Sequence, residues 1–340
     1  MKNSVRSCLM KNRIKWLYAA GLCFLLLSAV LSLCLGSSPL SLSEMADAFR
    51  HGLNASAGTR IFAYVRVPRT LASLLCGAAL SVSGAVIQGV LANRLASPSI
   101  IGVNAGAGLA VTLCTAYGIF GGWQLSLFSF LGAFAAVMLV SFAARHWGAS
   151  RGTVILIGVA LNSLLGAVSE SITTLFPEVG LMSNDFKIGE FAAVSYQKLL
   201  PAMLIICAVI FLLHTLHNEL EILSLGEENA KALGLNAGLM RSLFLLFAAL
   251  LAGCAVSLAG LLSFVGLLVP HALRRAAGSS ALHLMGLCSL YGAGFVCLCD
   301  TVARTAFSPY EIPVGIIMAY LGAPFFVFIL LKGKGGHSRD

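Results

Sequence analysis

Residues 217–241, HNELEILSLGEENAKALGLNAGLMR, separate two long apolar runs and decide how the chain is organised. This stretch holds several of the chain's acids, namely Glu219, Glu221, Glu227 and Glu228. It is too short and too poor in aromatic residues to form a core of its own. It is therefore predicted to be a polar loop that is not embedded in lipid and that joins two membrane helices.

The same stretch carries the signals of a short helix at 227–233. Acidic residues suit the start of a helix, and Gly234 suits its end. Ala230 and Leu233 are predicted to lie on one face, which would give this exposed helix a small apolar surface for a partner. A solvated loop without a partner is the alternative.

The composition places the chain among membrane proteins. Of its 340 residues, 59% are hydrophobic and 10% are charged, whereas about 25% are charged in an ordinary soluble domain. A helix needs roughly 20 apolar residues to cross the hydrocarbon core of a bilayer. Because the apolar runs are long and do not alternate with polar residues, they predict helices and not the strands of a barrel.

Ten spans are predicted in one polytopic domain that covers residues 1–340. They are 16–35, 68–90, 100–120, 124–144, 153–173, 199–216, 243–262, 263–273, 282–300 and 312–331. The eighth is too short as drawn and is expected to borrow residues from the seventh. The first is interpreted as a true span, because its apolar run is longer than that of a usual signal peptide.

The distribution of basic residues sets the orientation. If the ten spans cross the membrane in turn, most of the chain's 22 Lys and Arg fall in segments on one side, together with the basic N-terminal group before Trp16. That side is taken as the inside of the cell. By the positive-inside rule, both termini and the polar loop 217–241 are predicted to be cytoplasmic. The net charge of +9 is explained by topology, so it gives no support to nucleic-acid binding.

Charged residues are scarce within the predicted spans. Glu170 and Asp300 lie near span ends, and Asp300 stands four residues before Arg304, a spacing that allows an ion pair on one helical face. A secondary carrier would be expected to place a paired acid or base at mid-membrane. An intramembrane enzyme would need a catalytic set, yet no HExxH motif occurs. Both classes stay open as weaker alternatives.

Neither ATP nor a metal has a recognisable site in the sequence. No GxxxxGK[ST] motif is present, so any ATP-driven step needs a separate subunit. Most of the ten cysteines fall inside apolar runs and are interpreted as small buried hydrophobes. The Cys297-x-Cys299 pair has no accompanying ligands, so no metal and no cofactor is predicted.

Small residues recur at helical spacing in several spans, which favours close helix packing. Together with one glutamine in the same stretch, they form the predicted packing and pathway positions: Gly77, Ser81, Gly84, Gln88, Gly102 and Gly106.

Four stretches, taken together, resemble the FecCD family of ABC importer permeases. The first joins RVPRT (66–70), GAAL (77–80), SGAVIQ (83–88), LASP (95–98) and GVNAGA (102–107). The others are LGEE (225–228), FVGLLVPH (264–271), and EIPVG (311–315) with GAPF (322–325). They occur in the family's order over nearly the whole chain. The resemblance implies an all-helical type II ABC importer permease fold of about ten transmembrane helices in the cytoplasmic (inner) membrane.

The family resemblance also implies roles for particular residues. Arg66, Arg69 and Arg304, all outside in this threading, would pair with glutamates of a substrate-binding protein, a task that suits the guanidinium fork. Their pairing with nearby acids such as Asp300 is the competing interpretation. The positions Leu225, Gly226, Glu227, Glu228, Ala230, Leu233 and Gly234 resemble the family's coupling helices, which rest in a groove of the ATPase subunit.

The expected assembly follows from the same resemblance. Two permease chains, identical or paralogous, would join two ATP-binding cassette ATPase subunits and a periplasmic or lipid-anchored binding protein. An iron(III) chelate of the siderophore type is the predicted cargo, with haem and cobalamin as alternatives. The chain itself would be a transport subunit and not an enzyme. It departs from the family's usual pattern at Arg94, Ser99, Lys187 and Phe191, which bears on the cargo more than on the fold.

Overall fold

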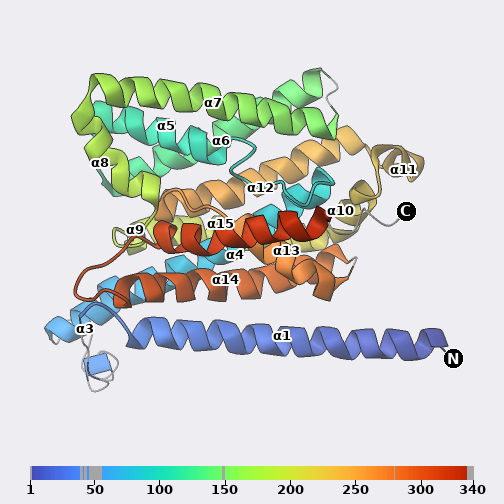
Figure 1. Cartoon of the computed structure of the whole chain (residues 1–340), viewed down its shortest axis with the longest axis horizontal. Coiled ribbons are helices and arrows are strands. Elements are labelled where there is room, and N and C mark those ends of the chain that lie inside the picture. Colours follow the sequence, from blue (N-terminus) through green and yellow to red (C-terminus); the bar gives the residue numbers. More distant parts are fainter. Residues whose placement is uncertain are drawn as a thin grey trace.

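The computed structural model describes residues 2–38, 41, 44–45, 56–147, 150–278 and 280–334. Within these ranges the chain is a bundle of helices without strands (Figure 1). The elements are α1 (Lys2–Cys34), α3 (Ala57–Ile61), the π-helical turn η1 (Phe62–Arg66), α4 (Val67–Val90), α5 (Val103–Ala116), α6 (Gly122–His146), α7 (Arg151–Leu175), α8 (Pro177–Ile188), α9 (Tyr196–Thr215), α10 (His217–Ser224), α11 (Glu227–Ala232), α12 (Ala237–Ala259), α13 (Val265–Ala277), α14 (Ala281–Thr305) and α15 (Val314–Lys334). The predicted all-helical class is confirmed.

The helices account for the predicted spans. Among the described residues, seven helices are long and apolar enough to cross a bilayer, and the apolar helices Val103–Ala116 and Val314–Phe328 are shorter. With α13 added, each of the ten predicted spans overlaps one of these helices.

The two ends of the bundle can be assigned from charge and topology. The start of α1 and the end of α15 lie at one end, with α10 and α11, whereas α3 and α8 lie at the other (Figure 1). The first end collects the basic termini and is the inner, cytoplasmic end. The end with α3 and α8 is called the outer end below.

Helix α4 forms the centre of the molecule. In the most apolar 18-residue stretch of the span that contains α4, 78% of the residues are buried. The corresponding share is 67% for α12, 56% for α14 and 17% for both α1 and α7. The sequence explains this position, because α4 is rich in Gly, Ala and Ser, whose small side chains let neighbouring helices approach closely.

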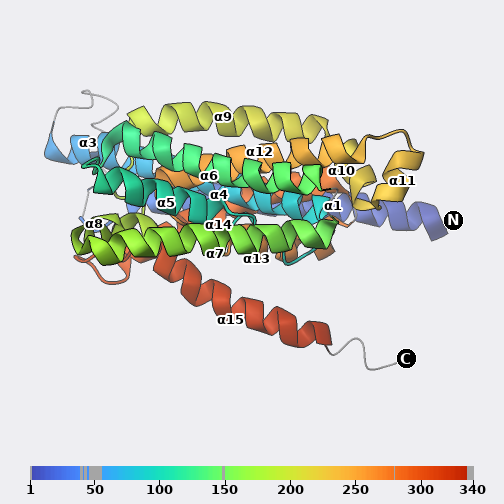
Figure 2. The ribbon, with the colours of Figure 1, turned by 90° about the horizontal axis from the view of Figure 1, so that it is seen from above.

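Two helices stand apart from this core. Figure 2 shows α15 diverging from the bundle, on the side opposite α9. Helix α7 lies along the same side as α15 in that view and buries little of its own surface. Apolar membrane helices with so little of their surface covered by their own chain leave room for a second chain on this side.

The segment before α5 enters the membrane as irregular backbone. Asn162, about 16 Å along α7 from its start, donates hydrogen bonds to the carbonyl oxygens of Ser99 (2.9 Å) and Ile100 (3.0 Å). That depth is close to the middle of a hydrocarbon core roughly 30 Å thick. Non-helical backbone is tolerated at such depth because it is buried within protein. The third span therefore becomes helical only at Val103, part of the way through the bilayer.

The predicted sharing of residues between the seventh and eighth spans is wrong. Helix α12 ends at Ala259 and α13 begins at Val265, so the residues between them are not helical. Gly260, just after α12, has φ +71°, and Phe264, just before α13, has φ +67°, and backbone with positive φ cannot continue a right-handed helix. The eighth span is short because an irregular segment supplies part of its crossing.

Candidate functional site

The helix predicted at the inner end is present as α11, and its end is built as expected. The N–H of Leu235 donates to the carbonyl of Ala230 (2.9 Å), and the N–H of Gly234 donates to that of Lys231 (2.9 Å). Gly234 has φ +80°. This is the Schellman arrangement. It favours glycine, because a residue without a Cβ adopts the left-handed conformation at the helix end without a steric clash.

The predicted apolar face of α11 is wrong in one respect. Ala230 is fully buried, whereas Leu233 is 63% exposed. Ala230 lies on the side of α11 that packs on the bundle, and Leu233 is the capping residue, beyond the last regular turn. In place of Ala230, the second exposed apolar side chain is that of Leu225, which is 64% exposed and lies just before Gly226. They flank α11 on the cytoplasmic surface, and Glu228 is exposed between them.

Polar contacts fix this inner segment to the long helices. Glu227 accepts a hydrogen bond from Arg241 of α12 (2.7 Å) and pairs with Lys231 (3.3 Å). The hydrogen bond from Arg241 lowers the pKa of Glu227, and the Lys231 ammonium adds to this effect. Arg151, at the start of α7, donates to the carbonyl of Leu223 in α10 (2.6 Å). A displacement of α10 and α11 would therefore be passed to α7 and α12.

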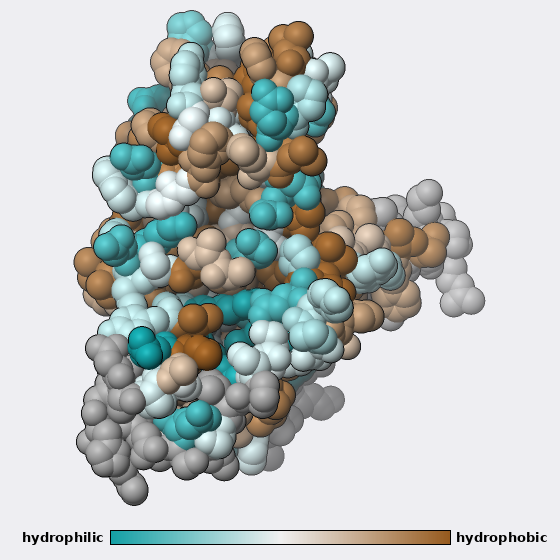
Figure 3. All heavy atoms as spheres, turned by 90° about the vertical axis from the view of Figure 1, so that its left-hand side faces the viewer, coloured by the Kyte–Doolittle hydropathy of each residue, from teal (hydrophilic) through white to brown (hydrophobic). Residues whose placement is uncertain are grey.

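The three predicted docking arginines lie at the outer end, but their side chains face inward. Arg66 is 3% exposed, Arg69 is 6% and Arg304 is 2%. Arg66 donates to the carbonyl oxygens of Leu33 and Cys34 at 2.8 Å each, which holds η1 against the end of α1. Figure 3 looks at this end of the bundle, where hydrophilic and hydrophobic side chains are intermixed on the surface.

Asp300 connects two of these arginines. It accepts from Arg69 Nε (3.0 Å) and Nη2 (2.9 Å), while Arg304 Nε lies 3.7 Å away. The predicted Asp300 to Arg304 pair is confirmed, but the interhelical pair with Arg69 is the closer one. Glu311, in the loop before α15, adds a contact with Arg69 Nη1 (2.7 Å). Burial raises the pKa of Glu311, but hydrogen bonds from Ser37 and Arg69 outweigh this and hold it below its ordinary value.

The small residues of α4 lie at its crossings with two other helices. A Cβ on Gly77 would collide with the backbone of Gly292 in α14, and one on Gly84 would collide with Gly266 in α13. Ser81 donates to the carbonyl of Cys288 (2.8 Å). The predicted packing role of this stretch thus rests on backbone contact between α4 and its neighbours.

Gln88 continues the α4 to α13 crossing toward the inner end. Its amide donates to the Gly266 carbonyl (3.3 Å), and its oxygen accepts from Arg274 of α13 (3.0 Å). The two glycines of the 102–106 motif have different roles. Gly106 meets the backbone of Gly132 in α6, whereas Gly102 has φ +103° and caps the start of α5.

The outer half of one face of α7 is polar although the helix spans the membrane. Ser163, Glu170 and Thr174 lie on this face and are exposed, with Ser171 beside them, whereas Leu156 continues the face toward the inner end and is 69% exposed. Glu170 makes no ion pair with any residue that the structure describes. Ionisable groups in membrane helices usually face a bundle interior or a water-filled cavity. This face therefore suits the wall of an aqueous path better than a lipid boundary.

Several contributing residues could not be identified from the sequence. Asn162 stands out only as a polar residue in an apolar run, and its carbonyl partners are far away in the chain. Gly266 and Gly292, which meet α4, carry no pattern that names their partner helix. Glu311 was part of a family motif, but nothing in the sequence linked it to Arg69.

Comparisons with known proteins cover almost the whole chain. The sequence model of the FecCD transport family matches residues 24–332. The chain is 33% identical to the uncharacterized ABC transporter permease protein YvrB of Bacillus subtilis (strain 168), over 99% of this chain and 100% of that protein. It is 35% identical to the vitamin B12 import system permease protein BtuC of Salmonella typhi, over 95% of this chain and 96% of that protein.

Solved structures give the same picture. A transporter assigned to the metal-chelate type of ABC transporter, in an inward-facing conformation, superposes with a TM-score of 0.81. The two chains are 30% identical, and the match covers 94% of this chain and 99% of that one. PsaBC from Streptococcus pneumoniae, at 19% identity and a TM-score of 0.55, shares the fold alone.

Proposed function

The chain belongs to the FecCD transport family, and we propose that, as an importer permease of this family, it moves an iron(III) chelate of the siderophore type across the cytoplasmic membrane. One observation carries the proposal: the fold agrees over 94% of the chain, at 30% sequence identity, with a metal-chelate type transporter. The family match over residues 24–332 supports the transport class. Membership supports a transport subunit and gives no reason to expect chemistry on the cargo.

Cobalamin is the second candidate cargo. It is favoured by the 35% identity with permeases named for vitamin B12 import. Haem is a further alternative within the same class of large metal complexes. A path lined by small and weakly polar side chains offers few groups that would distinguish among them.

The cargo path is proposed to lie between two copies of the chain or between this chain and a paralogue. The polar face of α7 and the largely uncovered helix α15 are on the same side of the molecule (Figure 2). Pairing two such sides would cover α15 and leave the α7 faces around a central aqueous path. Irregular backbone beside α7, held by Asn162, fits this position, since such backbone occurs in membranes only within protein or at a water-filled cavity.

The energy is proposed to come from two ATPase subunits that bind the inner end. Leu225 and Leu233 provide exposed apolar side chains there, and a short helix with apolar anchors suits a groove on a partner. The hydrogen bonds of Glu227 to Arg241 and of Arg151 to Leu223 support transmission of a displacement into α12 and α7.

Docking of a binding protein at the outer end remains a proposal for Arg66, Arg69 and Arg304. Their guanidinium groups already have internal acceptors. Carboxylates of a partner would therefore have to share or replace these acceptors, of which Glu311, whose side chain is 33% exposed, is an accessible one. Charge reversal at Arg66 and Arg69 should weaken capture of the binding protein. An unfolding curve on the same variant separates lost docking from lost folding.

A secondary carrier is less well supported. Such carriers use broken helices, and α5 and α13 are each preceded by irregular backbone in the membrane. However, the family match and the exposed apolar side chains at the inner end both favour a permease that works with an ATPase.

The test is ATP-dependent uptake into proteoliposomes that contain the chain with the ATPase and binding protein that co-purify with it. Radiolabelled ferric siderophore, haem and cobalamin are offered separately, with a non-hydrolysable ATP analogue as control. Uptake of the siderophore alone supports the proposal, and uptake of cobalamin selects the second candidate. Uptake that continues without ATP hydrolysis would contradict the importer mechanism.

A further inference from the structure

A groove between three helices at the outer end is not used by the proposed transport path. Its volume is about 430 Å³. Helix α6 contributes Trp123, Ser126, Leu127 and Phe130, α9 contributes Gln197, Lys198, Pro201, Ala202 and Ile205, and α12 contributes Cys254 and Ser257. On each helix these residues recur at intervals of three or four, so each helix presents one face to the groove.

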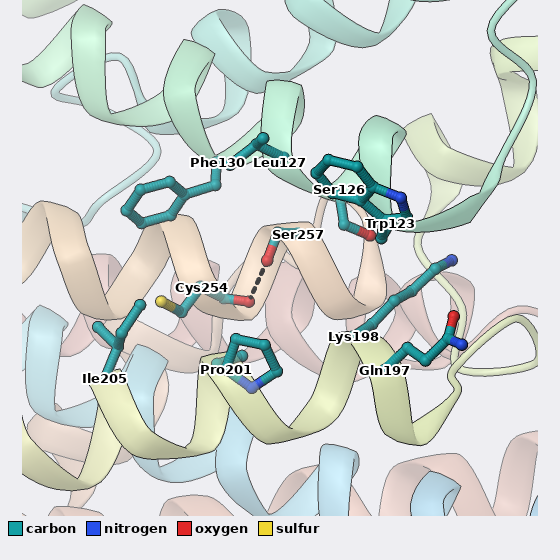
Figure 4. A pocket seen from close by; sticks show the side chains of 11 residues that line it. Trp123, Ser126, Leu127, Phe130, Gln197, Lys198, Pro201, Ile205, Cys254 and Ser257 are labelled. Carbon is teal, nitrogen blue, oxygen red and sulfur yellow. Dashed lines mark hydrogen bonds between the residues drawn. The ribbon is translucent and has the colours of Figure 1, made fainter.

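The groove has a polar mouth and an apolar interior. In Figure 4, Trp123, Lys198 and Gln197 lie toward one end, and Phe130, Ile205 and Cys254 lie toward the other. The polar group comes from the outer ends of α6 and α9, since Trp123 is next to the first residue of α6 and Gln197 next to the first of α9. Tryptophan and lysine at this level are typical of the membrane interface, where an apolar body meets a charged or polar surface.

The length of the groove matches one leaflet of a bilayer. At 1.5 Å per residue, the helix segment from Gln197 to Ile205 spans about 12 Å, and that from Trp123 to Phe130 spans about 10 Å. One leaflet contributes about 15 Å of hydrocarbon core. A single acyl chain that enters at the mouth would thus run along the groove through most of the outer leaflet.

The groove opens toward lipid and not toward a second permease chain. Its α9 wall lies on the side of the bundle opposite α15 (Figure 2). Leu204, beside the groove on α9, is 69% exposed, and Leu127 on α6 is 41% exposed. Because this side is opposite the one on which a second chain is proposed to pair, these exposed apolar side chains would face lipid.

The mouth has unused hydrogen-bonding capacity. Lys198 makes no ion pair with a carboxylate among the described residues, and its ammonium donates to the carbonyl of Ala193 (3.2 Å). An ammonium has three donors. The carbonyl of Gln197 is a second polar group there, because Pro201, one turn later in α9, has no N–H to donate to it. A positive charge above an apolar groove is complementary to an amphiphile with an anionic head.

We propose that this groove binds one phospholipid of the outer leaflet with a net negative charge, with an acyl chain between α6 and α9 and the headgroup phosphate at Lys198. The chain would fill the space over Cys254 and Ser257 of α12 and support α9 at a position where Pro201 weakens it. The lipid would be a bound structural component and not cargo, so this proposal is independent of the transported chelate.

The test measures lipid binding to the purified, delipidated full chain in detergent. Phosphatidylglycerol or phosphatidylcholine with the same acyl chains is added, and bound lipid is counted by native mass spectrometry while unfolding is followed by heating. The wild-type chain should retain phosphatidylglycerol more strongly. Lys198→Gln should weaken the retention of phosphatidylglycerol by about fivefold, which corresponds to one charge near an anionic headgroup. It should leave the retention of phosphatidylcholine unchanged.

Two further variants make the result specific. Ser126→Phe should fill the groove and reduce the retention of both lipids. Lys187→Gln, which removes a basic residue of α8 that does not line the groove, should behave like the wild type. Equal retention of the two lipids by the wild type, or equal effects of Lys198→Gln and Lys187→Gln, would overturn the proposal. Self-association of the chain through this groove, lost in Ser126→Phe, would also overturn it.

Discussion

Arg69 of α4 and Asp300 of α14 form a two-pronged ion pair that is almost completely buried, with the Nε and Nη2 atoms at 3.0 and 2.9 Å from the carboxylate. The pair joins two of the helices that form the core of the bundle. Removal of one partner of a buried pair leaves an uncompensated charge, which is far more costly than loss of an exposed pair.

Asp300→Asn is therefore expected to destabilise the chain by about 3–5 kcal/mol. Glu311→Gln is the matched control, since it removes a carboxylate that also contacts Arg69 but is 33% exposed, and its expected cost is below about 1 kcal/mol. Thermal unfolding in detergent compares the two. Equal costs would show that the buried pair does not hold α4 to α14.

Gly84→Ala is expected to disturb the crossing of α4 and α13, because the added methyl would occupy the position of the Gly266 backbone. Overpacking of this kind costs about 1–3 kcal/mol. Gly166→Ala in α7 has nothing within 4 Å of its added methyl and should change stability by less than about 1 kcal/mol. Unfolding in detergent provides the measurement. A stable Gly84→Ala variant would mean that this crossing can open without cost.

Leu225→Asp combined with Leu233→Asp should weaken the association with the ATPase by about 30-fold or more, the effect of losing an interface hot spot of about 2 kcal/mol. Leu181→Asp is the control, because Leu181 is 79% exposed but lies on α8 at the outer end. Association is measured by co-purification and by titration of the labelled ATPase. Full assembly of the double variant would place the coupling surface elsewhere.

The Glu227 to Arg241 pair predicts a pH dependence. The folded chain holds the pKa of Glu227 below its ordinary value of 4.5. The pair's contribution is thus fully present above that value and is lost as the pH falls through the lowered pKa. Because Glu227 is 44% exposed, this contribution should be less than about 1 kcal/mol.

The measurement compares the unfolding of wild type and Glu227→Gln from pH 7 downward. The difference between them should be constant near neutral pH and should shrink toward zero below about pH 4. Glu228→Gln, which removes an exposed acid from the same turn, should show no such dependence. A constant difference at all pH values would show that the carboxylate acts through packing and not through charge.

The sequence predicted the helices well and their contacts poorly. Apolar runs mark spans because lipid requires a fixed length, so each predicted span overlaps a helix. The same rule failed at the eighth span, where irregular backbone crosses part of the bilayer under cover of protein. Gly234 was identified because helix ends have a local signal. Pairing of Arg69 with Asp300 was only the competing interpretation for the outer arginines, since the two residues are far apart in the chain and pairing depends on tertiary packing, yet this is the contact that the structure shows.

The prediction for Ala230 and Leu233 shows the same limit on a small scale. Helical spacing alone put them on one face, but spacing cannot tell which side a bundle covers or where the last turn ends. The burial of the three outer arginines was also not evident from their outside position in the threading.

The outer ends of three helices are joined by main-chain atoms. The N–H of Leu261 donates to the carbonyl of Phe186 (2.9 Å), the N–H of Glu190 to that of Ala259 (2.8 Å), and the N–H of Gly315 to that of Gly189 (3.1 Å). The backbones lie so close together that a Cβ on Gly260 would collide with the Phe186 carbonyl, and one on Gly315 with the Ile188 carbonyl. Any gating motion at this end must then carry the ends of α8 and α12 and the start of α15 as one rigid piece. A hinge would have to lie farther along those helices, for example at Pro324 of α15.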